Sequence, residues 1–461
     1  MVGGPASQRR GWLGGADTAW VFALMLYVLA GVALVPFHGD ESTLIMMSRD
    51  YHDRFLAGDL SSLLYHDPPV DAARQHLRLL NGTVPPYLIG LAWHLAGYTV
   101  DDLNDQWLWG AGWAWNVANG HMPSPDLLLV ARWPSALLTA LSVPLLFGLG
   151  MCWGGRSVAY PASFILATHP VVLLQGRRAY MEGALLCFSL LVVLLAAWWG
   201  RRLMLAGRQG WQDWAAPLAL GVAAGLAAAS KHSGVVPVVG SFLGLLVLIV
   251  WRVPGRRGAA VSGLALSGLL AAVTFLVLNP AWWGDPLRRL LEVLALRQGL
   301  VTDQMAAFPE AVYPDLLARL GGLLAQLSVA PPAYYEVSAW SGYIAGPIQV
   351  YQASPWTGIQ YGVNALTALL GLGLLLLSLI GVGRLVRSLR NGQAAALIVG
   401  CSGGLALLVT LAAIPLAWQR YIMPLYPFEA LLAGGGLAWL GRRALRARRR
   451  PAPAHGAPPG G

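Results

Sequence analysis

The chain has 461 residues, of which 56% are hydrophobic and only 11% are charged. Because a soluble domain carries about 25% charged residues, this composition excludes a soluble fold. The net charge of +10 does not indicate nucleic-acid binding, since the arginines form short clusters between apolar runs, where orientation in a membrane explains them.

Apolar runs close to the roughly 20 residues that span a bilayer recur along the chain. We predict ten transmembrane helices, at residues 18–37, 127–152, 157–175, 180–200, 215–231, 234–251, 259–279, 362–383, 394–417 and 424–440. The three cysteines, Cys152, Cys187 and Cys401, lie inside or at the edge of these runs, so no disulfide or zinc framework is implied.

Basic clusters between the spans set the orientation. The positive-inside rule places them in the cytoplasm, and ten spans satisfy all of them at once. They are Arg9/Arg10, Arg201/Arg202/Arg208, Arg252/Arg256/Arg257, Arg384/Arg387/Arg390 and residues 442–450. The sequence therefore predicts a multi-pass protein of the plasma (inner) membrane.

The remaining apolar run, Val84 to Val100, is short and begins at Pro85-Pro86. Counting it as a span would invert part of the topology, so we predict an interfacial or re-entrant helix there. Two large external segments remain, at residues 38–126 and 280–361. The fold class is an all-α polytopic membrane protein with one domain over residues 1–445, and residues 446–461 are expected to be a disordered cytoplasmic tail.

Polar residues gather at the predicted outer ends of the spans. The first span ends in His38-Gly39-Asp40-Glu41, which is either a reactive carboxylate pair or the start of a hydrated loop. Arg132, Arg177, Arg178 and Glu182 follow at the ends of later spans. Arg178 and Glu182 are one helical turn apart, so a structural ion pair between them is the alternative to a binding role.

Two further cations lie at outer turns, Lys231 between the fifth and sixth spans and Arg420 between the ninth and tenth. Lys231 either meets an anion or extends to the membrane interface. Outer arginines run against the orientation rule, and a bound phosphate is the explanation we prefer, because guanidinium and ammonium groups match its charge and hydrogen-bond geometry. A carboxylate opposite such a site could act as a general base.

A divalent metal is a possible cofactor. The first external segment carries further potential ligands, but their spacing fits no standard metal motif. They are His38, Asp50, His52, Asp53, His66 and Asp67.

These motifs resemble, in order and topology, the C-type glycosyltransferase (GT-C) fold, close to the family 39 protein O-mannosyltransferases and the lipid A aminoarabinose transferases. The resemblance covers residues 18 to about 428. It rests on GDE at 39–41, NGTVPPY at 81–87, ARWPSAL at 131–137, RAYMEG at 178–183, SKHS at 230–233, NPAWW at 279–283 with Asp285-Pro286, and RYIMP at 420–424.

The resemblance implies an inverting glycosyltransferase that takes its sugar from a polyprenyl-phosphate carrier and acts on the non-cytoplasmic side. Asp40 would be the catalytic base and Glu41 its neighbour in acceptor or metal binding. Arg178, Lys231 and Arg420 would hold the carrier phosphate, with Arg132, Arg177 and Glu182 in support.

Two features depart from the family pattern. The chain shows no sizeable soluble domain at its C-terminus, and Val84 stands where relatives often carry a lysine before the paired prolines. A lipid, glycan or protein acceptor would then be recognised by the two external segments. A secondary transporter or flippase and a non-catalytic envelope scaffold are the alternatives, although neither requires a carboxylate opposite a cationic cavity.

Overall fold

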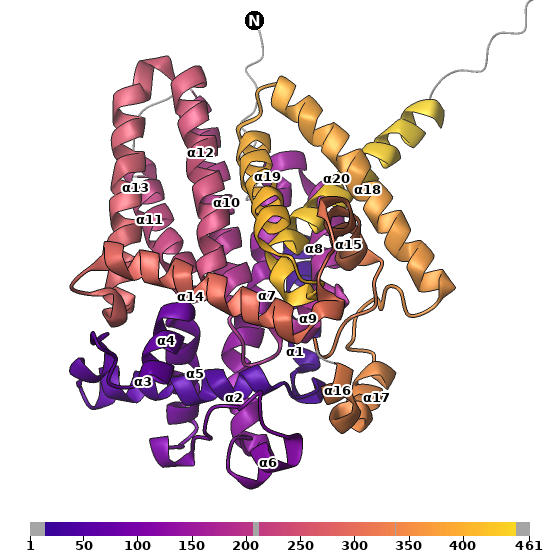
Figure 1. The fold of residues 1–461 in the computed structure, drawn as a ribbon. Helices are drawn as coiled ribbons and strands as arrows, with labels where there is room; N and C mark the ends of the chain where they lie inside the picture. The colour runs from indigo at the N-terminus through magenta and orange to yellow at the C-terminus, as the bar shows by residue number, and fades with distance from the viewer. Residues whose placement is uncertain (1–13, 206–211, 337, 449–461) are drawn as a thin grey trace, which may run out of the picture.

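The computed structural model describes residues 14–205, 212–336 and 338–448, and every regular element in these ranges is a helix. The long helices form one bundle (Figure 1). They are α1 (Gly15–Ala30), α7 (Pro125–Gly154), α8 (Arg156–Ala167), α9 (Pro170–Gly176), α10 (Glu182–Met204), α11 (Gln212–Ser230), α12 (Val235–Arg252), α13 (Arg257–Leu278), α18 (Ala365–Arg390), α19 (Ala394–Ala413) and α20 (Tyr426–Arg448).

Each predicted span corresponds to a helix or a helix pair. Seven of these helices are long and apolar enough to cross a membrane, and α8 with α9, bent by 58°, form a possible eighth span. The bend falls where Pro170 begins α9, because proline cannot continue the preceding helix. The helices α11 and α20 occupy the two remaining predicted spans, so the all-α polytopic fold is confirmed and the number ten is approximate.

The core lies around α10, which packs against α7, α11, α12 and α19. In contrast, α13 and α18 have only 11% and 22% of their apolar windows buried. Uncovered leucines such as Leu269 and Leu369 are costly in water and ordinary against lipid. The pattern is that of an integral membrane protein.

Shorter helices cover one end of the bundle, the lower end in Figure 1, which we call the capped end. From the first predicted external segment come α2 (Gly39–Met47), α3 (Arg49–Tyr51), α4 (Ala72–Leu80), α5 (Val84–Leu95) and α6 (Trp113–Ala118). From the second come α14 (Pro286–Ala307), α16 (Ser338–Ser341) and α17 (Ala345–Ala353), while α15 (Leu316–Ser328) packs against α18.

The helix predicted at Val84 to Val100 is α5, which ends at Leu95. The helix α20 continues to Arg448, three residues into the segment 446–461 predicted as a tail, and residues 449–461 lie outside the described residues. The basic residues Arg9, Arg10 and Arg208 also lie outside them.

Candidate active site

The acidic pair lies in the first turn of α2, at the capped end. The His38 side chain caps this helix: its Nδ1 accepts a hydrogen bond from the Asp40 backbone N–H at 3.2 Å, and Glu41 Oε2 accepts one from the His38 N–H at 3.1 Å. Gly39 is required here, because a Cβ atom would lie 2.6 Å from Trp107. The helix dipole favours negative charge at this position.

Glu41 is enclosed and fully hydrogen-bonded. Its carboxylate oxygens accept from Arg132 Nε at 2.7 Å and Nη2 at 2.8 Å, and Oε1 accepts the Ala179 N–H at 2.9 Å. The Glu41 side chain is 0% exposed. Burial alone would raise the pKa of Glu41, but Arg132 lowers it below its ordinary value. This carboxylate connects α2 to α7 and to the turn before α10.

Asp40, one residue earlier, is 23% exposed and forms an ion pair with Arg420 in η10 (Gln419–Leu425). Arg420 Nε also lies 3.3 Å from Glu336 Oε1, and Glu336 Oε2 lies 2.8 Å from His38 Nε2. Because His38 Nδ1 already accepts a hydrogen bond, His38 Nε2 is the atom that donates to Glu336. These four residues, His38, Asp40, Glu336 and Arg420, are called the mouth cluster below.

The charges of the mouth cluster favour ionised carboxylates. Burial alone would raise the pKa of Asp40, but the positive charge of Arg420 lowers it below the ordinary value. The pKa of Glu336 is lowered for the same reason. Burial alone would lower the pKa of Arg420, and the two carboxylates raise it instead. The lowered pKa favours an ionised Asp40 carboxylate at neutral pH, and this carboxylate is partly exposed.

Aromatic rings flank the mouth cluster. The His38 ring stacks on Tyr335 with centroids 4.3 Å apart, and Trp109 lies 5.4 Å from His38 on another side. Trp109 is 41% exposed and contacts the ring of Trp340 from the second external segment. A ligand at Asp40 would meet an aromatic face here.

Arg177 and Arg178 are 0% exposed and bind the chain itself. Arg178 donates to the carbonyl oxygens of Pro36 at 3.2 Å and Tyr334 at 2.8 Å. Arg177 donates to Val28 O at 2.6 Å and to the Tyr351 hydroxyl at 3.0 Å. Arg178 still contributes charge beneath the mouth cluster, since it helps to lower the pKa of Glu336.

Lys231 precedes η5 (His232–Gly234) and forms an ion pair with Glu182 at 2.6 Å. The Arg178–Glu182 pair that helical spacing allows is therefore replaced by a pair between Glu182, the first residue of α10, and Lys231, in the turn after α11. The Lys231 side chain is 13% exposed and that of Glu182 is 4% exposed. The next residue, His232, places Nε2 2.7 Å from Leu79 O.

Helix α14 extends between the Lys231 region and the mouth cluster. Arg297 donates to Leu80 O, beside the carbonyl that His232 contacts, and two turns later Gln304 accepts a hydrogen bond from the Tyr421 hydroxyl at 3.1 Å. Within the described residues no carboxylate pairs with Arg297. Burial, and to a lesser extent the charge of Arg420, lower the pKa of this guanidinium.

The structure thus brings Asp40 and Arg420 together and leaves Lys231 on a second, neighbouring ion pair. The sequence did not point to Glu336 or Arg297, and His38 was predicted only as a possible metal ligand. No motif spacing marks Glu336, which lies 296 residues after Asp40. Within the described ranges, no group of three or more His, Cys, Asp or Glu side chains is arranged to hold a metal ion.

Comparison with known proteins supports the resemblance seen in the sequence. Residues 80–284 match the family model of dolichyl-phosphate-mannose-protein mannosyltransferases. A comparison with curated proteins returns no significant match.

Solved structures with a similar fold share little sequence. The oligosaccharyltransferase of Archaeoglobus fulgidus tethered with an acceptor peptide has a TM-score of 0.52 at 13% identity, over 94% of this chain and 51% of that chain. ArnT of Cupriavidus metallidurans bound to undecaprenyl phosphate scores 0.46 at 15% identity, over 94% and 64%. The S. cerevisiae protein O-mannosyltransferase Pmt1-Pmt2 complex bound to the sugar donor scores 0.40 at 16% identity, over 58% and 33%.

The chain spans about half the length of the oligosaccharyltransferase and one third of the O-mannosyltransferase chain. The oligosaccharyltransferase fold is matched across nearly all of this chain, and the family match covers the second half of the first external segment and the spans from α7 to α13. The family match indicates a glycosyltransferase, the enzyme class predicted from the sequence, and the structural likeness shows the fold. Residues 80–284 thus resemble the dolichyl-phosphate-mannose-protein mannosyltransferase family, and the chain as a whole has the fold of the C-type membrane glycosyltransferases.

Proposed function

We propose that this protein transfers a sugar from a polyprenyl-phosphate carrier to an acceptor on the non-cytoplasmic side of the plasma (inner) membrane, with Asp40 as general base. The observation that carries the proposal is the position of the Asp40 carboxylate in the first turn of α2. It is partly exposed, forms an ion pair with Arg420 and has a lowered pKa that favours the ionised form. The family match adds a donor class, since its members are named for dolichyl-phosphate-mannose.

The proposed reaction is a single displacement. An acceptor hydroxyl or amine attacks the anomeric carbon while Asp40 removes its proton, and the bond from that carbon to the phosphate oxygen breaks with its electron pair going to the phosphate. Because attack and departure occur on opposite faces, the configuration inverts. The products are the glycosylated acceptor, protonated Asp40 and the polyprenyl phosphate.

The departing phosphate would be held by Arg420, Lys231 and Arg178. Arg420 uses Nη1 and Nε toward Asp40 and Glu336, which leaves Nη2 for an incoming oxyanion. Lys231 would exchange Glu182 for the phosphate, and Arg178, enclosed by carbonyl groups, would act through its charge. Arg297 joins this set in our proposal because it is a half-buried cation that pairs with no carboxylate of the described residues, between Lys231 and Arg420.

The remaining residues of the acidic and basic set would support this geometry. Glu41 and Arg132 fix α2 against α7, Arg177 anchors the turn before α10, and Glu182 holds Lys231 between turnovers. We assign the capped end to the non-cytoplasmic side from the positions of the basic residues. Arg252 and Arg256/Arg257 lie at the turn between α12 and α13, at the opposite end of the bundle (Figure 1), and the positive-inside rule places that end in the cytoplasm.

The test is transfer of radiolabelled sugar from a panel of polyprenyl-phosphate donors by purified protein in membrane extract, comparing wild type with Asp40→Asn. We expect transfer with at least one donor by wild type and none above background by the variant. Normal transfer by Asp40→Asn would refute the assigned base.

No transfer by folded wild type with any donor would favour a transporter, flippase or scaffold. The same assay in chelator and then with added Mg²⁺, Mn²⁺ or Ca²⁺ tests the possible divalent metal: a rate restored by one ion would establish the requirement. A rate unaffected by the chelator would reject it.

A further inference from the structure

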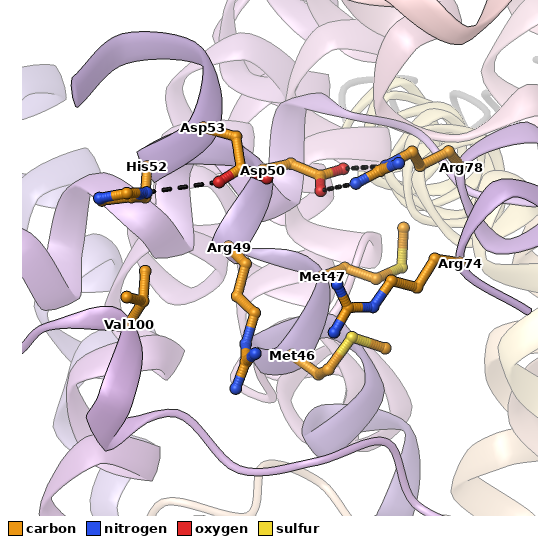
Figure 2. Close-up of a pocket in the computed structure, with 9 residues that line it drawn as sticks. All are labelled: Met46, Met47, Arg49, Asp50, His52, Asp53, Arg74, Arg78 and Val100. Atoms are coloured by element: carbon orange, nitrogen blue, oxygen red, sulfur yellow. Dashed lines mark hydrogen bonds and ion pairs between the residues drawn. The ribbon is translucent and has the colours of Figure 1, made fainter. Parts of the chain in front are cut away.

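A second polar cavity opens beside α2, away from the mouth cluster. It encloses about 200 Å³, room for roughly six water molecules at about 30 Å³ each. Figure 2 shows Met46 and Met47 at the end of α2, with Arg49 and Asp50 just beyond them and Arg74 and Arg78 from α4. The proposed function uses none of these residues.

The carboxylates of this cavity are already paired. Asp50 accepts two hydrogen bonds from Arg78, at 2.9 Å from Nε and 2.7 Å from Nη2. Asp53 lies 3.3 Å from His52 Nδ1 and accepts a 3.3 Å hydrogen bond from the Ser62 hydroxyl. The charge of Asp50 is therefore matched by Arg78, whereas the partners of Asp53 are a hydroxyl and a histidine ring.

Two guanidinium groups of the cavity lack a strong counter-ion. The Arg49 side chain forms no hydrogen bond or ion pair with any described residue, and its Nε is a buried donor without an acceptor. Arg74 has only Asp71, at 3.4 Å, and both side chains of that pair are about half exposed, so the pair contributes little. In Figure 2 no dashed line joins Arg49 or Arg74 to another residue drawn.

The cavity lies further along α2 than the proposed base. Met47, which lines it, follows Asp40 by seven residues, two turns further on. Two turns of helix correspond to about 10 Å. Thr43 and Leu44, which lie between them on the helix, are buried, so the cavity is separate from the mouth cluster.

We propose that this cavity binds a phosphate group, held between Arg49 and Arg74. Guanidinium forks match phosphate oxygens in charge and geometry, and a buried unpaired Nε donor gains most from such a partner. The inference goes beyond the proposed function, because it concerns a site apart from Asp40. The phosphate could belong to a soluble phosphorylated glycan or to a lipid headgroup.

The experiment measures binding of inorganic phosphate to the full chain in phosphatidylcholine nanodiscs, by ³¹P NMR, after the carrier site has been filled with polyprenyl phosphate. We expect a further phosphate site in wild type, which becomes weaker as salt is raised. In Arg49→Gln/Arg74→Gln this site should be weakened about tenfold or more. Arg288→Gln is the matched control, since Arg288 is an exposed arginine of the capped end paired with Asp67, and it should bind as wild type does.

The competing sources are separated by two additions. Displacement of phosphate by phosphatidylglycerol added to the nanodiscs would identify a lipid headgroup, and displacement by a soluble phosphosugar alone would identify a glycan phosphate. Equal phosphate binding by wild type and the double variant, or stronger competition by hexaglutamate than by either phosphate, would overturn the proposal, the latter in favour of an acidic polypeptide.

A failure of the proposed function can be told apart from a failure of the cavity assignment. Asp40→Asn should retain this second phosphate site, because Asp40 does not line the cavity. If Asp40→Asn kept normal transfer while the site persisted, the catalytic assignment would fail and the cavity would stand. If Asp40→Asn lost transfer while the double variant bound phosphate as wild type does, the cavity assignment alone would fail.

Discussion

Asp40 and Glu41 are adjacent carboxylates in the same helical turn, yet their surroundings differ completely. Glu41 receives two guanidinium and two backbone hydrogen bonds and has no exposed surface, whereas Asp40 is partly exposed and shares Arg420 with Glu336. A fully satisfied buried ion pair holds elements together, and a partly open, shared one can exchange partners. The capped end therefore contains a fixed group of charges next to an adaptable one.

The largest effect should come from Asp40→Asn, which removes the base and keeps the size of the side chain. We expect transfer to fall by about 10²–10⁴-fold, with carrier binding and the melting temperature almost unchanged. Sugar transfer and thermal unfolding, measured on the same preparation, check both. A variant that unfolds earlier and retains its rate per folded molecule would instead place Asp40 in the fixed group.

Glu41→Ala should act in the opposite way, through stability. It leaves the Arg132 guanidinium buried without its partner, a change that typically destabilises a protein by about 3–5 kcal/mol. Thermal unfolding in detergent would report it.

Replacement of both partners, as in Glu41→Met/Arg132→Leu, should recover much of the lost stability, because no charge then remains unpaired. If Glu41→Ala had the melting temperature of wild type and lost only activity, the structural role assigned to Glu41 would be wrong.

The dependence of kcat on pH tests whether Arg420 sets the pKa of Asp40 in the mouth cluster. In wild type the pKa of Asp40 lies below its ordinary value, so the base is ionised above that pH and the rate falls only as pH drops through the lowered pKa. In Arg420→Gln burial remains without the positive charge, so the pKa of Asp40 rises and the acid limb of the kcat profile moves to higher pH. The profile is measured at saturating donor, since Arg420 is also proposed to bind the carrier. An unmoved acid limb would show that Asp40 is not the titrating base.

The sequence predicted the helical framework well, because apolar length and basic clusters determine the membrane spans locally. It also predicted that charged groups would collect at one end, and Asp40 and Arg420, 380 residues apart, do meet there. Which charges pair could not be predicted in the same way. Helical spacing suggested Arg178 with Glu182, whereas the packing of α10 beside α11 gives Glu182 to Lys231.

The two charged residues that were missed lie in the second external segment, one in a loop and one on a helix. Glu336 precedes α16 in a loop where no periodicity or motif places it, so only the tertiary fold brings it to His38. Arg297 looks like one of several solvated arginines on an amphipathic helix, and it becomes half-buried because α14 packs against α4. Their roles as charge partners in the site stay proposals.

The smallest effect should come from the Lys231–Glu182 ion pair. Like Glu41 and Arg132 it is mostly buried, and like Asp40 and Arg420 its charges lack a full set of hydrogen-bond partners among the described residues. Glu182→Gln keeps a hydrogen-bond acceptor for Lys231 and removes the competing negative charge. If Lys231 serves the carrier phosphate, polyprenyl phosphate should bind a few-fold more tightly, a gain of about 1 kcal/mol. Lys231→Met in the same background should remove that gain, measured by titration in nanodiscs. A Glu182→Gln variant that melts earlier and binds the carrier as wild type does would place this pair with Glu41 and Arg132, as a contact that holds α10 to α11 and nothing more.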